Sequence, residues 1–147
     1  MKTDFVDFVD PQKHKEVAPF GPYDRAIDFL GDGSFYLVDS PGDLAGRLGA
    51  VARIAPNSFV FLAGGARHNR LCYDPGERLI SGRVHQDVDA ARKTVGWLKK
   101  LNVEYPNVII ILTHEKERVR EMPLFPDDDL KQWAVREIEK RITKSAL

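Results

Sequence analysis

Four short apolar segments separated by turn residues occupy the chain between residues 25 and 64. They are RAIDFL (25–30), SFYLVDS (34–40), LGAVARI (48–54) and SFVFLAG (58–64). Their lengths are typical of strands, because most helices of globular proteins are longer. The sequence GDG at 31–33 is a strong hairpin signal, and APNS at 55–58 is a turn between the last two segments. The pattern predicts a meander of antiparallel strands.

The second half of the chain shows helical periodicity on both sides of one apolar strand. In DVDAARKTVGWLKKLN (87–102), apolar residues recur at helical spacing behind a capping Asp87. VIIILTH (108–114) indicates a buried strand, and DDDLKQWAVREIEKRIT (127–143) indicates a terminal helix whose first aspartates suit the helix dipole. We therefore predict an α+β fold, with a mixed or antiparallel sheet and helices on one face.

Length and composition limit the class of protein. The chain has 147 residues, of which 43% are hydrophobic and 30% charged, which suits one globular domain. We expect an N-terminal arm over 1–24, where three prolines interrupt any periodicity, and a single domain over 25–147. Twenty-two basic residues balance 22 acidic ones, so neither nucleic acid nor a membrane surface is an expected partner. No apolar run is long enough for a signal peptide or membrane span, and we expect a cytoplasmic protein.

Few side chains are candidates for chemistry. Cys72 is the single cysteine, which excludes a disulfide or a thiolate zinc cluster within one chain. No two of the four histidines are spaced as H-x-H or H-x₃-H, so local spacing indicates no zinc site. His68 and His114 follow predicted strands, where a functional role and a structural one both remain open. His14 and His85 are expected to be structural or solvated.

Three segments carry a resemblance to a known family: GDGSFYLVDSPGDLAGRLGA (31–50), FVFLAGGARH (59–68) and the strand that ends in THE (113–115). In this order they resemble the C-terminal half of metallo-β-lactamase-fold proteins, in particular a fungal lactonase-like or hydrolase-like branch. The match covers about residues 21 to 117.

The resemblance also shows which metal ligands are replaced. In the family, the loop after SPG supplies a histidine for the first metal, and here that position is Asp43. The second loop histidine corresponds to Arg47, and the metal-bridging aspartate corresponds to Gly65. The histidine that ends the last strand is retained as His114. The family's upstream H-x-H-x-D-H motif has no copy in this chain.

A count of ligands predicts that the metal centre is lost. Zinc takes three or four good protein ligands, whereas the resemblance leaves one histidine and a replacement carboxylate. Arg47 adds a permanent positive charge near the position of the metal. We therefore expect no metal and no other cofactor.

The resemblance also has a consequence for assembly. The family fold is an αββα sandwich, and a truncated half of it would expose an apolar sheet face to water. We expect a second copy to cover that face, which gives a homodimer. The alternative is that the N-terminal segment FVDFV (5–9) folds back over it.

The residues that would line the old cleft are Asp43, Arg47, His68 and His114. A carboxylate, a guanidinium and imidazoles can transfer protons and stabilise anions without a metal. We therefore expect a metal-independent isomerase, cyclase or lyase acting on a small-molecule substrate, and the resemblance suggests fungal secondary metabolism. Two alternatives remain open. One is a non-catalytic pseudoenzyme that binds a ligand or a partner. The other is a lactonase-like zinc hydrolase with an atypical site at Asp43, His68 and His114.

Overall fold

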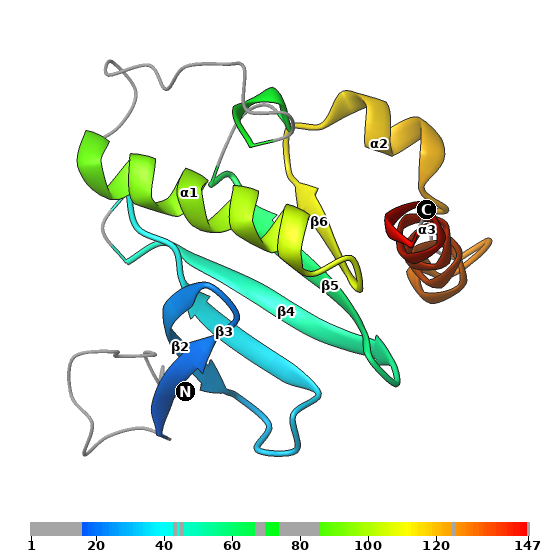
Figure 1. The fold of residues 1–147 in the computed structure, drawn as a ribbon, viewed down its shortest axis with the longest axis horizontal. Helices are drawn as coiled ribbons and strands as arrows, with labels where there is room; N and C mark the ends of the chain where they lie inside the picture. Colours follow the sequence, from blue (N-terminus) through cyan, green and yellow to red (C-terminus); the bar gives the residue numbers. More distant parts are fainter. Residues whose placement is uncertain are drawn as a thin grey trace.

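In the part of the chain that the structure describes, six strands pair in sequence order to form one open sheet, and three helices pack around it (Figure 1). The computed structural model describes residues 16–42, 44, 46–66, 70–73, 86–124 and 126–146. The strands are β1 (Val17–Phe20), β2 (Tyr23–Asp28), β3 (Phe35–Asp39), β4 (Leu48–Ala55), β5 (Ser58–Gly64) and β6 (Val108–Leu112). The helices are α1 (Val88–Glu104), α2 (Lys116–Glu121) and α3 (Leu130–Ser145), with a 3-10 turn at Arg70–Cys72.

The sheet is mixed, as predicted. Strands β1 to β5 form an antiparallel meander, and β6 pairs with β5 in parallel after the crossover through α1. A parallel pair requires such a long crossover, whereas the antiparallel pairs are joined by short turns. The α+β class and the meander are therefore confirmed. Strand β1 and the first residues of β2 fall within 1–24 and pair at the edge of the sheet.

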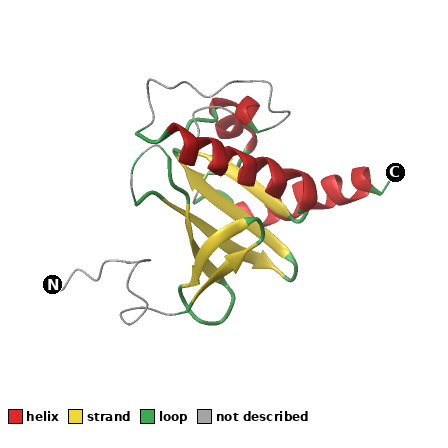
Figure 2. Cartoon of the chain, turned by 60° about the vertical axis from the view of Figure 1, so that its left-hand side comes forward, coloured by secondary structure: helices red, strands yellow, loops and turns green. Residues whose placement is uncertain are grey.

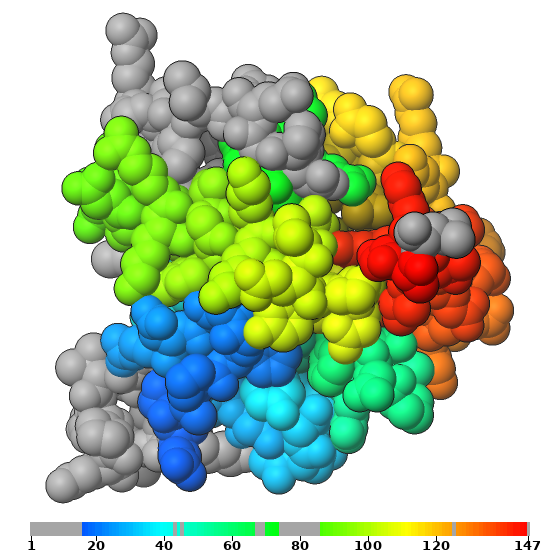
Figure 3. Space-filling model, viewed as in Figure 1, coloured from blue at the N-terminus to red at the C-terminus, as the bar shows by residue number. Residues whose placement is uncertain are grey.

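The helices lie on both faces of the sheet, so the expectation of helices on one face is wrong. Alternate residues of β6 belong to two separate cores. One core lies against α1 and includes Leu98, Leu101, Val108, Ile110 and Leu112. The other lies against α3 and includes Val60, Ile109, Trp133, Ala134 and Ile138. Because VIIIL is apolar on both faces, both need a covering element. In the space-filling view, α1 covers the middle of the molecule and α3 lies to its right (Figure 3).

Local signals place the turns and caps. The Asp28 carboxylate accepts the N–H groups of Gly31 at 2.9 Å and Gly33 at 2.8 Å, which closes the predicted hairpin. Asp87 caps α1 as expected, because its side chain accepts the Ala90 N–H at 2.9 Å. Helix α2 was not predicted. No helix in the described part of the chain has the length and apolar character needed to cross a membrane.

Strand β6 is an edge strand, and side chains from beyond it occupy backbone groups at both of its ends. Arg141 of α3 donates to the carbonyl oxygen of Val108 at 2.7 Å and to that of Asn102 at 2.6 Å. At the other end, Glu115 accepts the Leu112 N–H at 3.3 Å. Such contacts protect an apolar edge from pairing with another chain.

Candidate functional site

Four strand ends meet at one edge of the sheet. Strands β5 and β6 both end there, and because the other pairs are antiparallel, β3 ends and β4 begins at the same edge. The Thr113 N–H donates to the Gly64 carbonyl oxygen at 2.9 Å, and the Ser40 N–H donates to the Arg47 carbonyl oxygen at 3.0 Å. The ends of parallel strands are a common place for ligand sites.

The structure describes two of the four predicted site residues. Arg47 lies directly before β4, and His114 lies two residues beyond β6, so both are at this edge. Asp43 and His68 lie outside the described residues, as do the other two histidines, His14 and His85. The convergence of all four site residues on one cleft therefore stays a prediction.

The Arg47 guanidinium lies against Gly65. A Cβ built on Gly65 would be 2.7 Å from Arg47 Nη1, closer than real Cβ contacts come. By the resemblance, Gly65 stands where the family has its metal-bridging aspartate. A side chain at residue 65 and the guanidinium in its present position exclude each other. The two replacements are therefore in direct contact in space.

The described part of this edge does not fit the family's metal. Within it, no three histidine, cysteine or carboxylate side chains are grouped so that they could hold an ion. At residue 65 a divalent cation would meet a glycine in place of a carboxylate, and beside it a permanently charged guanidinium. The Arg47 guanidinium occupies the volume that the cation would need and repels its positive charge.

A double-mutant cycle can test the contact between Arg47 and Gly65. We expect Gly65→Ala to cost about 1 kcal/mol of unfolding free energy, because the guanidinium at the end of a flexible side chain has to move. In an Arg47→Ala background the same change should cost close to nothing. Urea denaturation of the four proteins measures the coupling. An equal cost of Gly65→Ala in both backgrounds would show that the contact does not exist in solution.

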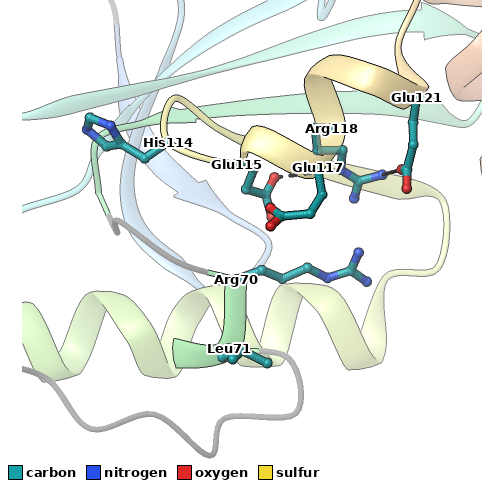
Figure 4. A pocket seen from close by; sticks show the side chains of 7 residues that line it. All are labelled: Arg70, Leu71, His114, Glu115, Glu117, Arg118 and Glu121. Atoms are coloured by element: carbon teal, nitrogen blue, oxygen red, sulfur yellow. Dashed lines mark ion pairs between the residues drawn. The ribbon is translucent and has the colours of Figure 1, made fainter.

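A cavity of about 330 Å³ opens beside His114 (Figure 4). Its lining contains two guanidiniums, three carboxylates and one imidazole, from Arg70, Leu71, His114, Glu115, Glu117, Arg118 and Glu121. The volume is at the lower end of the range for small-molecule sites. The charged lining suits a small polar molecule better than an apolar one.

Glu115 is a buried carboxylate at the wall of this cavity, with 5% of the residue exposed. One carboxylate oxygen, Oε2, accepts the Leu112 N–H and lies 3.6 Å from Arg118 Nε. Among the described residues, its Oε1 atom has no hydrogen-bond partner. The Arg118 guanidinium in turn lies 5.4 Å from the centre of the Trp133 ring, which connects α2 to α3. A buried charge held in this way fixes the turn that carries His114.

Local sequence patterns do not identify Glu115 as part of a site. The available signal was an acidic residue directly after a buried strand, with Arg118 three positions later. That spacing is common on exposed helices as well, so it does not by itself indicate burial. The burial results from α3, whose Trp133 lies on the far side of Arg118.

His114 faces a different direction from the carboxylates. Figure 4 shows its imidazole turned away from Glu115 and Glu117, while the residue itself is exposed. His114 nevertheless belongs to the lining of the cavity. Guanidiniums in the same lining can bind a carboxylate or a phosphate group.

Comparisons with known proteins give partial matches. Neither a protein-family model nor a solved structure matches the chain. The chain is 34% identical over 134 residues to the cytochrome P450 monooxygenase mpaDE of Penicillium roqueforti, a match of 76% of this chain and 16% of that protein. Over 53 residues it is 49% identical to the metallo-hydrolase mfmC of Annulohypoxylon moriforme, covering 35% of this chain and 13% of that protein. Over 51 residues it is 49% identical to the gamma-lactamase MBL2 of Gibberella moniliformis, covering 33% of this chain and 21% of that protein. Over about a third of its length, the chain is metallo-β-lactamase-like.

This metallo-β-lactamase-like chain spans only part of its relatives. The match covers 16% of the Penicillium roqueforti protein and 21% of the gamma-lactamase MBL2. The predicted resemblance to a fungal hydrolase-like branch is confirmed by these relatives. The activities in the names of these relatives are those of proteins much longer than this chain.

Proposed function

We propose that the chain catalyses metal-independent acid–base chemistry on a small organic anion. The reaction class is an isomerisation, a cyclisation or an elimination, each of which can proceed by moving protons. The observation that carries this proposal is the charged cavity whose lining includes His114 together with Arg70 and Arg118. As part of the same proposal, the reaction belongs to fungal secondary metabolism. Support for this part comes from the fungal relatives, which include a metallo-hydrolase and gamma-lactamases.

Each side chain has a distinct role in this proposal. His114 exchanges the proton, because imidazole is the side chain that gains and loses protons most readily near neutral pH. Arg70 is exposed at the cavity wall and binds the substrate anion. Arg118 is mostly buried against Glu115 and Trp133, so it supports the wall of the cavity. Asp43, Arg47 and His68 complete the proposed cleft.

A second candidate is a ligand-binding protein without catalysis. The replaced metal position favours it, because the Arg47 guanidinium now lies against Gly65, where the resemblance places the bridging aspartate. A lactonase-like zinc hydrolase is the weakest candidate. At residue 65 its bridging carboxylate is replaced by a glycine that contacts a guanidinium.

The proposal predicts a large effect of His114→Gln on turnover. We expect kcat/KM to fall by about 100-fold or more, since the proton-transfer group is removed. The melting temperature should stay unchanged, because the residue is exposed. Lys116→Gln is the matched control, as Lys116 is an exposed neighbour that does not line the cavity. Turnover is followed by NMR on chelator-treated protein with a panel of small hydroxy acids, lactones and lactams.

Three outcomes of that experiment separate the candidates. Turnover that His114→Gln abolishes in the presence of chelator supports the metal-independent enzyme. Melting shifts with members of the panel, but no turnover, would support the ligand-binding protein instead. Turnover lost on chelation and restored by zinc, together with stoichiometric zinc in the purified protein, would establish a hydrolase.

A further inference from the structure

Two apolar rows cross the sheet on the face opposite α1. In a sheet, directly paired residues on neighbouring strands point to the same face. The strand register therefore defines a first row that consists of Val17, Ile27, Leu37, Ala50, Leu62 and Ile111. Beside it, a second row consists of Phe29, Phe35, Ala52, Val60 and Ile109.

Helix α3 covers only one end of these rows. It packs on β4, β5 and β6, where Val60 and Ile109 are buried against Trp133. Figures 1 and 2 place α3 beside the β5–β6 end of the sheet and away from β2 and β3. At the β2–β3 end, Phe29 is 47% exposed, whereas Ile27 is 3% exposed. On β5, Leu62 lies outside the cover of α3 and is 42% exposed. We call this region the open face, and define it by Phe29, Phe35, Leu37, Ala50 and Leu62.

An ion pair lies at the rim of the open face. Arg25 and Asp39 oppose each other on β2 and β3, with Nη1 and Oδ2 separated by 3.7 Å. Their side chains are 42% and 23% exposed, respectively. Burial raises the pKa of the Asp39 carboxyl, and the positive charge of Arg25 opposes that rise. A further cation near Asp39 would therefore stabilise its charged form.

We propose that the open face binds the open face of a second copy of this chain. The two sheets pack face to face about a two-fold axis, and Arg25 of each copy lies opposite Asp39 of the other. A surface with one positive and one negative charge side by side is complementary to itself after a two-fold rotation. The 22 basic and 22 acidic residues of the chain balance, so its net charge does not oppose self-association.

The size of the open face sets the expected strength of this dimer. With strands about 4.8 Å apart and about 3.3 Å of rise per residue, four strands by five residues measure roughly 19 Å by 17 Å. This is small for a specific interface, so we expect a dissociation constant in the micromolar range.

The first test is sedimentation velocity over concentrations from about 1 to 300 µM. The 16.6 kDa chain should change from monomer to dimer across this range. Leu62→Lys should remain monomeric, and because Leu62 is already 42% exposed, its circular dichroism should match that of the native protein. A native chain that is monomeric at every concentration would overturn the proposal.

A second test uses charge reversal and mixing. Arg25→Asp and Asp39→Arg should each weaken dimerisation at least about tenfold, because each homodimer then brings like charges together. An equimolar mixture should dimerise as the native chain does, since every cross-interface contact again joins opposite charges. In the mixture, the ion pair between residues 25 and 39 within each chain remains broken. Recovery of dimerisation would therefore report on the contact between the two copies alone.

The matched control is the same kind of ion pair on the other face of the sheet. Lys93 of α1 pairs with Asp24 of β2 at 2.8 Å, and both side chains are exposed. Lys93→Asp should leave the monomer–dimer equilibrium unchanged. A mixture of the two open-face variants that stays monomeric, while each variant is folded, would refute the proposed two-fold arrangement.

Discussion

Gly42→Ala is expected to lower the free energy of unfolding by about 3–5 kcal/mol, through backbone strain and overpacking together. Gly42 has a φ of 134°, a conformation that residues with a side chain rarely adopt. A Cβ at this position would lie 2.4 Å from the Ala91 Cα and 2.6 Å from the Ala91 nitrogen. Both are backbone atoms of α1, so they cannot turn aside as a side chain would. A loss of this size is comparable to the whole stability of many small domains.

The close approach has a structural purpose, because it joins the loop after β3 to the first turns of α1. The Gly42 carbonyl oxygen accepts the Asp87 N–H at 3.1 Å, and the Pro41 carbonyl oxygen accepts the Thr94 hydroxyl at 2.6 Å. The same loop leads to Arg47. Undocking it from α1 would therefore disturb the candidate site as well as the core.

Two other glycines provide matched controls for this prediction. Gly46 has a φ of 74° but open space around its Cβ position, so Gly46→Ala should cost only about 1–2 kcal/mol. Gly96 lies within α1 and also has open space, so Gly96→Ala should stabilise by about 0.5–1 kcal/mol. Urea denaturation followed by circular dichroism measures all three. If Gly42→Ala costs no more than Gly46→Ala, the contact with α1 is not present in solution.

The strands and the two long helices could be predicted because their signals are local. The GDG hairpin, the Asp87 cap and the periodicity of the terminal helix each depend on a few neighbouring residues. The arrangement of the helices could not be predicted in this way. An uninterrupted apolar strand such as VIIIL (108–112) has no alternation, and therefore its sequence does not show which face a helix will cover.

The candidate site was predictable only in part, for a similar reason. The sequence identified Arg47, Gly65 and His114 separately, through the resemblance. The contact of Arg47 with Gly65 depends on the start of β4 lying beside the end of β5, which is a matter of strand register. The burial of Glu115 depends on Arg118 and on Trp133 of α3. Such contacts between distant segments have no signature in local spacing.

Phe61→Ala is expected to cost about 3–5 kcal/mol, the range for removing a fully buried aromatic ring. Phe61 is 0% exposed and lies at the centre of the core between the sheet and α1. Its ring makes an edge contact with Tyr23, with the ring centres 5.3 Å apart. The cavity left by alanine would be lined by strands on one side and α1 on the other, so it could not close without moving both.

The Phe61 ring also requires a glycine on β4, two residues before its strand partner Val51. A Cβ on Gly49 of β4 would lie 2.4 Å from Phe61 Cε2 and 2.7 Å from Cζ. Gly49→Ala should therefore destabilise the native protein by about 1–3 kcal/mol through overpacking. Phe61→Leu removes the ring atoms that clash, so Gly49→Ala should cost much less in that background. The expected coupling between the two changes is about 1–2 kcal/mol.

This double-mutant cycle separates packing from backbone preference at Gly49. Its φ is not positive, so alanine is compatible with its backbone conformation, and β-strands disfavour glycine. If the ring contact is the dominant cost, Gly49→Ala becomes neutral or stabilising once Phe61 is leucine. If Gly49→Ala costs the same in both backgrounds, glycine is required for another reason. The Phe61 ring then does not pack against Gly49 in solution. Thermal and urea unfolding of the four proteins decide between these outcomes.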